Sequence, residues 1–370
     1  MIYTVADNIL SPLGIDTDSN YKAISDGISG ISLIENQDLF QDSFFGSVVP
    51  ENIIKHVDGL TRLEAMFCQS IASAIDHLNL DLNKTILIVS STKGNIDTLT
   101  IDGEGVRVKL IDMAIKINDH FNFSHKPVVI SNACISGVSA LLSAQRLIES
   151  GIYDHAIVSG GDLLSKFVLS GFNCLKAVSD APCQPYDEDR KGISLGEAIG
   201  TVVVSNNKDL CKSKLSLSKI SGGGQSNDAN HISGPSRTGE GLKLAINKAL
   251  QKAGLSTKDL DYINAHGTAT LFNDEMESIA FDFLGLDEVP LNSLKGYYGH
   301  TLGASGIIES IITVRQMNYN TVIASKGSQN ISVSGKLNVA KENKQVNLSR
   351  VLKTASGFGG CNGAIIFEKQ

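Results

Sequence analysis

The chain contains no tryptophan among its 370 residues, and only 6% of its residues are aromatic. This scarcity argues against a stacking surface for carbohydrate or nucleic acid. No stretch approaches the 18 consecutive apolar residues of a membrane-spanning helix, so none is predicted. There is also no extended run of Lys and Arg, and the formal net charge is −7. Broad binding of nucleic acid is therefore not expected.

Cysteine is sparse, and its spacing forms no recognisable framework. The six cysteines are Cys68, Cys134, Cys174, Cys183, Cys211 and Cys361, and no two of them form a CxxC pair. Because this spacing matches neither a zinc site nor a disulfide scaffold, we predict reduced thiols in a cytoplasmic protein. The opening residues MIYTVADNILSPLG lack the basic and apolar regions of a secretory signal.

Short β-branched runs alternate with amphipathic segments, which predicts an α/β protein. The content of 42% hydrophobic residues and 35 glycines is typical of a compact, turn-rich globular chain. The predicted strands are 85–90, 127–131, 155–160, 200–205, 214–220, 261–265, 290–294, 350–356 and 364–369. The predicted helices are 63–78, 136–149, 238–253, 273–284 and 304–317.

The polar segment 206–214 separates two series of elements of comparable length. We therefore predict two α/β halves, 1–205 and 206–370, that together form one compact unit. Sequence identity between the halves is weak, so a duplication is only suggested. In the last predicted helix, four isoleucines between 307 and 312 form an apolar stripe, and Arg315 marks a polar edge.

Cys134 lies in the stretch VVISNACISGVSALL (128–142), between a predicted strand and a predicted helix. Most lone cysteines in apolar segments are packing residues. A thiol at a helix N-terminus, however, lies at the positive end of the helix dipole, which favours the thiolate. Ser136, Gly137 and Ser139 keep the first turn narrow enough for a substrate to reach the sulfur. Taken alone, this stretch fits either a core thiol or a nucleophile.

Two histidines lie in matching contexts, each between a predicted strand and a predicted helix. His266 lies in NAHGTAT (264–270), and His300 lies in KGYYGHTLGASG (295–306). One histidine at a strand end is usually structural, whereas two in the same setting beside a candidate nucleophile indicate a site. The glycine-rich turn SGFGGCNG (356–363) is either an ordinary hairpin turn or a source of backbone N–H donors.

These four pieces, in this order, resemble the β-ketoacyl-acyl carrier protein synthases, the elongating condensing enzymes of the thiolase superfamily. The resemblance extends nearly end to end, with further similar segments at 10–14, 21–35, 185–200, 226–235 and 241–278. It implies a thiolase-like fold in which two similar α/β halves form α/β/α/β/α layers. The half 1–205 would carry the nucleophile, and the half 206–370 would carry both histidines.

The resemblance also implies a reaction, the decarboxylative Claisen condensation of an acyl thioester with malonyl-acyl carrier protein. Cys134 would hold the acyl group as a thioester. His266 and His300 would donate hydrogen bonds to the malonyl thioester carbonyl while CO₂ leaves. The backbone N–H groups of Cys134 and Phe358 would form the oxyanion hole, and Phe358 would gate the acyl pocket.

Further residues receive roles from the same resemblance. Lys295 would be a catalytic residue that, with Glu309, supports the histidines; Thr268 and Thr270 would bind the phosphopantetheine arm; Asp274 and Glu277 would be buried structural acids. No metal or redox cofactor is implied, since hydrogen bonds stabilise the developing charge. The implied partners are acyl carrier protein and a second subunit, in a homodimer or in a heterodimer with a related chain. The product would serve fatty acid or polyene/polyketide-type synthesis.

The chain departs from the family pattern around the nucleophile. The segment between the strand 85–90 and Cys134 has 43 residues (91–133), fewer than the elongating family. Asn132 and Ile135 flank the nucleophile where small hydroxylated residues are usual, and Cys361 replaces a threonine. The basic helix that docks the carrier is reduced to Arg62 and a few neighbours. Acyl-chain length is therefore the property that transfers least from the resemblance.

Three alternative functions fit parts of the pattern. Cys361 in the glycine-rich turn would suit the second cysteine of a non-decarboxylating thiolase. A chain-length-factor-like subunit would share the fold, although such subunits typically lack the reactive cysteine, and an active subunit of such a heterodimer also fits. A Cys/His hydrolase would use one histidine as a base but leaves the other, and the threonines, without a role.

Overall fold

The computed structural model describes residues 1–100 and 102–370. Within these residues, eleven strands form one sheet in the order β13-β11-β10-β15-β16-β9-β1-β8-β6-β4-β5. Its strands in the first half are β1 (Tyr3–Leu10), β4 (Thr85–Ser90), β5 (Val128–Ile130), β6 (His155–Asp162) and β8 (Ala198–Ser205). Those in the second half are β9 (Ser218–Asn227), β10 (Tyr262–Asn264), β11 (Pro290–Asn292), β13 (Asn338–Val339), β15 (Arg350–Gly357) and β16 (Cys361–Glu368).

The two halves of this sheet repeat one topology. In the first half, β5, β4 and β6 run parallel, whereas β8 is antiparallel to both β6 and β1. In the second half, β11, β10 and β15 run parallel, whereas β16 is antiparallel to both β15 and β9. Strand order and direction therefore correspond for five strands of each half, and only the edge strand β13 of the second half has no counterpart in the described sheet. The comparison of the two half-sequences only suggested this repeat.

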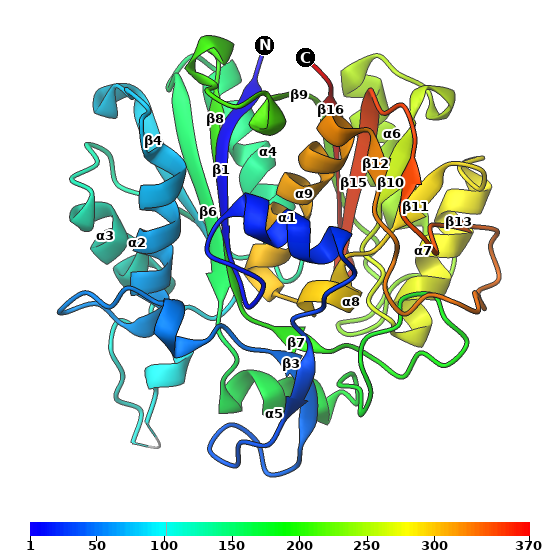
Figure 1. Cartoon of the computed structure of the whole chain (residues 1–370), viewed down its shortest axis with the longest axis horizontal. Helices are drawn as coiled ribbons and strands as arrows, with labels where there is room; N and C mark the ends of the chain where they lie inside the picture. The colour runs from blue at the N-terminus through cyan, green and yellow to red at the C-terminus, as the bar shows by residue number, and fades with distance from the viewer. Residues whose placement is uncertain (101) are drawn as a thin grey trace.

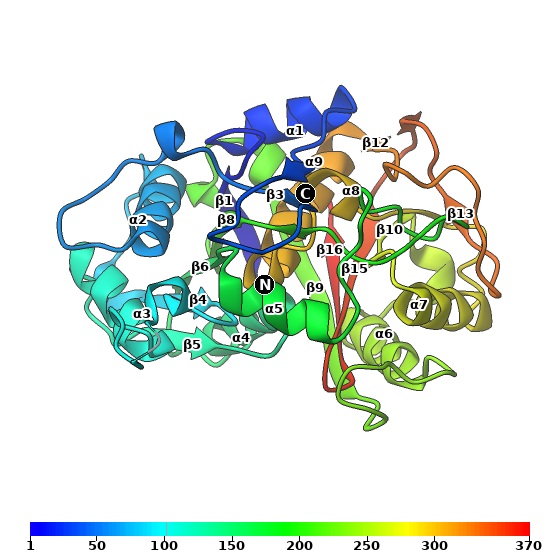
Figure 2. The same ribbon diagram turned by 90° about the horizontal axis from the view of Figure 1, so that it is seen from below.

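Helices cover the sheet in layers. The helices are α1 (Thr17–Ser25), α2 (Arg62–Ile75), α3 (Leu110–His120), α4 (Ser136–Glu149), α5 (Lys166–Cys174), α6 (Glu240–Ala253), α7 (Leu271–Phe283), α8 (Lys295–Tyr298) and α9 (Ser305–Tyr319). Helices α2 and α3 cover the first half of the sheet, and α6 and α7 cover the second (Figures 1 and 2). Helices α4 and α9 lie between the halves, which confirms the layered, thiolase-like architecture.

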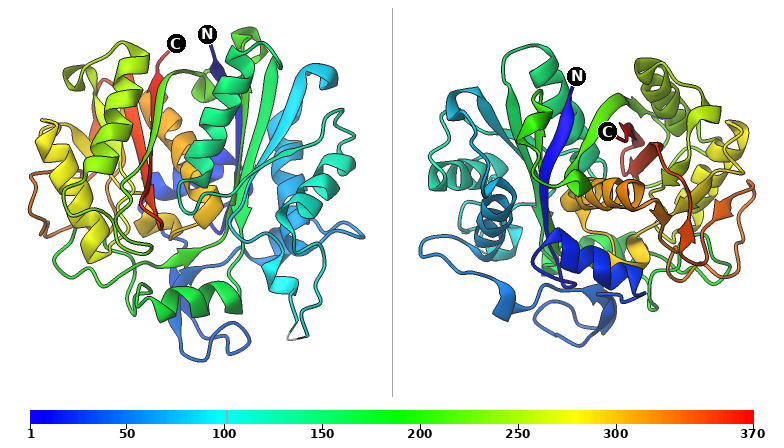
Figure 3. Two further views of the ribbon diagram at one scale, coloured as in Figure 1. Left: turned by 180° about the vertical axis from the view of Figure 1, so that it is seen from behind. Right: turned by 45° about the horizontal axis from the view of Figure 1, so that its top comes forward.

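The halves meet where β1 and β9 begin. These strands pair over only two residue pairs, Tyr3 with Lys219 and Thr4 with Ser218, and then diverge around α4 and α9. Figure 3 shows the two central helices from behind and from above, and it places both chain termini at the same end of the molecule. The reacting groups described below lie toward the opposite end.

Helix α9 differs from the amphipathic helix that the sequence predicts. Residues 305–317 are all buried, including Arg315, which is 5% exposed. A helix covered on all sides needs partners for its polar groups, and the Arg315 guanidinium lies 3.0 Å from an Asp7 carboxylate oxygen. The expectation of a polar edge at Arg315 was therefore wrong, because a buried ion pair takes its place.

Every predicted strand and helix overlaps an observed one. The main shift concerns 214–220, where residues Lys214–Ser216 form a 3₁₀ turn and β9 begins only at Ser218. The sequence missed β1, α1, α3, α5, α8 and β13, together with the short strands β2 (Ser32–Ile34), β3 (Phe44–Ser47), β7 (Leu195–Gly196), β12 (Thr321–Val322) and β14 (Lys344–Gln345). Among the described helices, none is both long and apolar enough to cross a membrane.

Candidate active site

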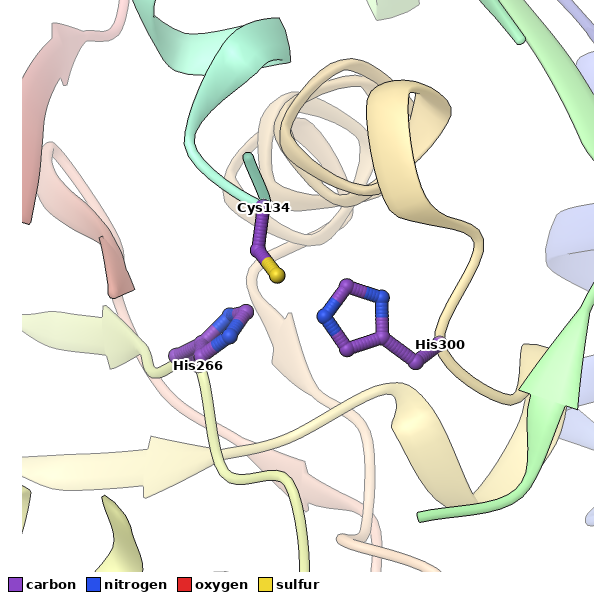
Figure 4. Close-up of side chains that lie close together, drawn as sticks. All are labelled: Cys134, His266 and His300. Carbon is purple, nitrogen blue, oxygen red and sulfur yellow. The ribbon is translucent and has the colours of Figure 1, made fainter. Parts of the chain in front are cut away.

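Cys134, His266 and His300 meet in one buried cluster, as Figure 4 shows. The thiol sulfur and one nitrogen of each imidazole all lie within 4.8 Å of one another. The two imidazole rings are nearly perpendicular, with centroids 5.3 Å apart. Three side chains that are up to 166 residues apart in sequence could therefore contact the same small group.

The central helices bring Cys134 and His300 together. Cys134 lies in the loop from β5 into α4, and His300 lies in the loop from β11 into α9, the corresponding place in the other half. The first turns of the two helices touch through glycine: a Cβ on Gly137 would lie 2.8 Å from the backbone nitrogen of Ile307, and one on Gly306 would lie 2.5 Å from that of Val138. Only glycine allows this approach.

The loop that carries Cys134 is held in a strained conformation. Ala133 has a φ of +44°, a region that side-chain-bearing residues rarely adopt. The Ser136 hydroxyl accepts a hydrogen bond from the Asn132 N–H at 2.7 Å and donates one to the Ala133 carbonyl at 2.6 Å. These two bonds fix the sharp turn between β5 and α4 that directs the sulfur at the histidines.

Burial raises the pKa of the Cys134 thiol to about 11. The positive charge of Lys295 and the backbone N–H groups of Phe358 and of Cys134 itself act in the opposite direction but do not outweigh burial. The sequence-based expectation that the helix N-terminus favours a free thiolate is therefore wrong, because burial outweighs these effects. The thiol needs a nearby base when it reacts, and a nitrogen of His266 lies within 4.8 Å of the sulfur.

The hydrogen bonds of His300 define its tautomer. Its Nδ1 accepts a hydrogen bond from the Leu302 backbone N–H at 3.0 Å. A neutral imidazole that accepts at Nδ1 carries its proton on Nε2. This Nε2 is buried and has no hydrogen-bond partner among the described residues. His300 therefore presents an unused N–H donor, the group that stabilises a developing oxyanion.

Two buried acids hold the backbone around His266. Glu277 accepts hydrogen bonds from the backbone N–H groups of His266 at 2.8 Å and Gly267 at 2.7 Å. Asp274 accepts one from Thr268 at 2.9 Å, and burial raises its pKa to about 6. The ring itself is buried, and its Nδ1 lacks a partner in the described part of the chain.

A charged cluster lies beneath the histidines. Glu309 is 2.6 Å from Lys295 through one carboxylate oxygen and 2.6 Å from Lys353 through the other. Burial and the charges of the two lysines hold the pKa of both His266 and His300 well below the usual value. The sequence analysis identified Lys295 and Glu309 but missed Lys353, although a lysine inside an apolar predicted strand was a visible signal.

Asp162 is a second residue that the sequence analysis missed. This fully buried carboxylate at the end of β6 accepts the backbone N–H groups of Thr92 and Lys93, and also that of Gly303 at 2.8 Å. It thereby ties the end of β4 to the loop between His300 and α9. Only the repeated topology, which places these chain segments together, gives this carboxylate its role.

A cavity of about 690 Å³ leads from the surface to the three reacting groups. Thr268 and Thr270 line it, and their hydroxyls are 2.8 Å apart. Phe358 also lines it and stacks on Phe172 with ring centroids 5.6 Å apart. The predicted site residues thus fall into two groups: those at the cavity surface, and Lys295, Glu309, Asp274 and Glu277 behind them.

The cavity and its surroundings bear on metal binding and on the thiolase alternative. A thiol and two imidazoles at this spacing could also ligate a metal ion, but two buried lysines share a single glutamate close behind them, and their positive field disfavours a divalent cation. Cys361 is not among the cavity-lining residues, and its sulfur accepts the Asn227 side-chain amide at 3.4 Å. The structure thus places the candidate second cysteine of a thiolase outside the cluster.

The family models that match the chain are those of β-ketoacyl synthase, with the N-terminal domain over residues 109–209 and the C-terminal domain over residues 217–328. The chain is 28% identical over 404 residues to 3-oxoacyl-[acyl-carrier-protein] synthase 2 of Vibrio cholerae, covering 98% of this chain and 97% of that protein. It is 33% identical over 255 residues to the protein of the same name from Rhizobium meliloti, covering 65% and 60%.

Solved structures show the same relationship. A ketosynthase (ApeO) in complex with its chain length factor (ApeC) from Xenorhabdus doucetiae superposes with a TM-score of 0.88 at 25% identity, covering 100% of this chain and 98% of that one. The ishigamide ketosynthase/chain length factor has a TM-score of 0.90 at 21% identity, covering 100% and 99%, and shows the same fold. The chain belongs to the β-ketoacyl synthase family of acyltransferases and has the thiolase-like fold of that family.

Proposed function

We propose that this protein condenses an acyl group held on Cys134 with malonyl-acyl carrier protein, releasing CO₂ and forming 3-oxoacyl-acyl carrier protein. The observation that carries the proposal is the cluster of one thiol and two imidazoles within 4.8 Å, with an unused N–H donor on His300. The condensation needs a nucleophile for the acyl group and donors for an enolate, and this cluster offers both. We propose that no metal or redox cofactor takes part.

The first step transfers the acyl group. The Cys134 sulfur attacks the acyl thioester as the His266 imidazole accepts the thiol proton, the bond from the carbonyl carbon to the carrier sulfur breaks, and that sulfur takes up the proton. His266 can accept the proton because its lowered pKa keeps the ring neutral, whereas His300 already uses its Nδ1 lone pair to accept from Leu302. We expect the backbone N–H groups of Cys134 and Phe358, both of which act on the sulfur and lower its pKa, to donate hydrogen bonds to the oxyanion.

The second step forms the carbon–carbon bond. The bond from the malonyl carboxylate to the methylene carbon breaks, CO₂ leaves, and the electron pair forms an enolate whose oxygen accepts hydrogen bonds from His266 and His300. The methylene carbon then attacks the acyl carbonyl on Cys134. The carbon–sulfur bond breaks, the thiolate leaves and regains a proton, and the free thiol is restored. That proton comes from solvent, because the malonyl group leaves as CO₂ without a proton, and each turnover therefore consumes one proton.

The charge around the cavity entrance supports an acidic carrier as the donor. Lys176, Lys191 and Arg237 line the cavity and are exposed, and Asp228 is the one acidic residue among its described lining residues. Lys191 pairs with the exposed Asp180 at 3.2 Å, whereas no ion pair is found for Lys176 and Arg237 among the described residues. This local excess of positive charge occurs in a chain whose net charge is −7, and it would attract an anionic partner. Arg62, the expected docking residue, is instead bound to Glu51 and Glu197, each at 3.0 Å.

We further propose a second subunit, either another copy or a related chain. Strand β5 is the last strand in the order of the described sheet, and its residues Val128, Val129 and Ile130 are only partly buried. Helix α3 beside it exposes Ile111 and Ile115. An edge strand with apolar neighbours favours pairing with another chain. Sedimentation of the purified chain, alone and with a candidate partner, distinguishes homodimer from heterodimer.

The deciding experiment incubates the protein with malonyl-acyl carrier protein and a panel of acyl carriers, then measures intact protein mass and the carrier products. We expect an acyl adduct on Cys134 and a 3-oxoacyl carrier product. The Thr268→Val variant should lower kcat/KM for carrier-bound substrates without removing the adduct. Elongation of C8–C16 saturated acyl carriers would assign the chain to ordinary fatty acid synthesis instead of a specialised pathway.

Other outcomes of the same assay contradict the proposal. Release of free acid without a condensation product would identify a hydrolase. Condensation of two acetyl thioesters with no requirement for malonyl would identify a thiolase. An adduct on Cys134 without any product, even with a second subunit added, would show that the chain stops at acyl transfer.

A further inference from the structure

Lys353 is a buried cation that the reaction described above does not use. It lies in the middle of β15, beside Asn264 of β10 on one side and Ile365 of β16 on the other, and it is fully buried. Lysine is almost never buried in a sheet unless it is paired. Its presence here therefore needs an explanation beyond packing.

The Lys353 ammonium group joins three chain segments at the site. It lies 2.6 Å from a Glu309 oxygen on α9. It donates hydrogen bonds to the carbonyl of Thr354, at 2.6 Å, and to the carbonyl of Ala265, at 3.5 Å. Ala265 directly precedes His266, and β15 leads directly into the turn that carries Phe358. The Lys353 ammonium thus holds the backbone next to two predicted hydrogen-bond donors, the His266 imidazole and the Phe358 N–H.

Two cations share one carboxylate at this point. Lys295 on α8 occupies the other oxygen of Glu309 at 2.6 Å. Glu277 on α7 contributes a second negative charge nearby but is bound to the backbone N–H groups of His266 and Gly267. Lys295 already pairs with Glu309, so Lys353 adds a second positive charge near the imidazoles, and the charges of both lysines disfavour a proton on His266 and His300.

We propose that Lys353 is a positioning residue that fixes the His266 loop and keeps His266 and His300 uncharged until the substrate arrives. The charged and titratable groups that face the histidines are Lys295 from α8, Glu309 from α9, Glu277 and Asp274 from α7, Cys134 from the loop before α4, and Lys353 from β15. An uncharged imidazole can accept the thiol proton in acyl transfer, whereas an imidazolium cannot.

The effect of Lys353 is largest on that first step. Removing its charge makes a proton on either imidazole more favourable, so the histidines become charged at a higher pH than in the wild type. Acyl transfer to Cys134 then fails at a higher pH. We expect the loss of this one buried charge to change the protonation equilibrium of the imidazoles by about tenfold, or about one pH unit. The kinetic part of this inference rests on the proposed function.

The test follows the two histidines directly by NMR titration of protein labelled in the imidazole rings. In Lys353→Met, both imidazoles should titrate about one pH unit higher than in the wild type, and the acid limb of Cys134 acylation should move with them. Lys353→Arg keeps the charge and should restore wild-type titration. Unchanged histidine titration in folded Lys353→Met would overturn the proposal.

A matched control removes a second buried cation, Arg315, which lies on the same helix as Glu309, the partner of Lys353. Arg315→Met breaks the buried ion pair with Asp7, two turns along α9 from Glu309, and should leave the histidine titration unchanged. An equal shift in that variant would mean that any lost ion pair loosens the site. If Lys353→Met does not fold, NMR titration of the wild-type protein still tests the proposal. A histidine that becomes protonated at or above about pH 6.5 in the wild type would overturn it. The NMR readout needs no turnover, so a shift without any condensation product would refute only the proposed function.

Discussion

The two central helices, α4 and α9, occupy the same place in the two halves of the molecule, but their entry loops perform different tasks. The loop into α4 presents the Cys134 thiol through a strained backbone turn at Ala133. The loop into α9 presents the His300 N–H, with Lys295, Glu309 and Lys353 behind it. The shared topology fixes the position of both groups, and the local surroundings decide the chemistry of each.

The comparison also explains why the site needs both halves. The repeat places two helix N-termini face to face, in contact through Gly137 and Gly306. Each loop then contributes the function that the other lacks: a nucleophile from the first half, and hydrogen-bond donors from the second. The ion cluster of Lys295, Glu309 and Lys353 lies in the second half alone. This placement agrees with a site in which the protonation of the histidines, and not that of the thiol, is controlled by buried charges.

The largest expected effect comes from removing the nucleophile of the first half. Cys134→Ala should abolish the acyl adduct and reduce condensation by at least about 10³-fold, because no other side chain can hold the acyl group. Intact-mass spectrometry and product analysis measure both. Cys361→Ala is the matched control and should keep the adduct. If Cys361→Ala lost activity to the same extent, the thiolase alternative would regain support.

Removing a donor of the second half should separate the two steps. His300→Ala should lower CO₂ release from malonyl-acyl carrier protein by roughly 10²–10³-fold, as for the loss of an oxyanion donor, while Cys134 still acquires an acyl group. His266→Ala should also lose CO₂ release. Labelled malonyl carrier measures the decarboxylation. Normal CO₂ release by both variants would show that the second half does not stabilise the enolate.

The contact between the two helices can be broken without touching a reacting group. Gly306→Ala places a methyl group against the Val138 backbone, so the helices must separate, with a loss of about 1–3 kcal/mol in the free energy of unfolding and lower activity. Urea denaturation measures the change. Gly171→Ala, in the helix α5 with open space around it, should be neutral or stabilising by less than about 1 kcal/mol. Equal losses in both variants would mean that the close approach is unimportant.

The smallest expected effect is a pH dependence that originates in the second half. Because the pKa of His266 and His300 is lowered in the folded state, only the unfolded chain gains these protons below about pH 6.5. Stability should therefore fall as the pH decreases from 7 to 5.5, by at most about 1.4 kcal/mol per histidine per pH unit.

The measurement compares urea denaturation of the wild type and the His266→Gln/His300→Gln double variant at both pH values. The variant should lose less stability on acidification. Asp274, whose pKa is raised to about 6, acts in the opposite direction, since the folded state binds its proton more tightly. Asp274 is present in both proteins, so its contribution cancels when the pH dependence of their free energies of unfolding is compared. Equal pH slopes would show that the histidines titrate normally.

The three candidate site residues could be singled out from the sequence because each lies in a distinctive local pattern. Cys134, His266 and His300 each lie between a predicted strand and a predicted helix, with small residues beside them. The strand β1 was missed because Asp7 and Asn8 interrupt its apolar pattern. Both are paired only in the folded chain, Asp7 with Arg315 at 3.0 Å and Asn8 with Ser70 at 3.3 Å.

The sequence by itself determined the alternation of strands and helices, and the resemblance implied the layered fold and singled out Cys134, His266 and His300 as candidate reacting residues. These depend on local periodicity and on short motifs, which a single stretch of chain contains. The tertiary structure alone decided the repeat of the two halves, the roles of Lys353 and Asp162, the tautomer of His300 and the high pKa of Cys134. Each of these depends on burial and on partners distant in sequence, and only the folded chain brings those charges and dipoles within reach of one another.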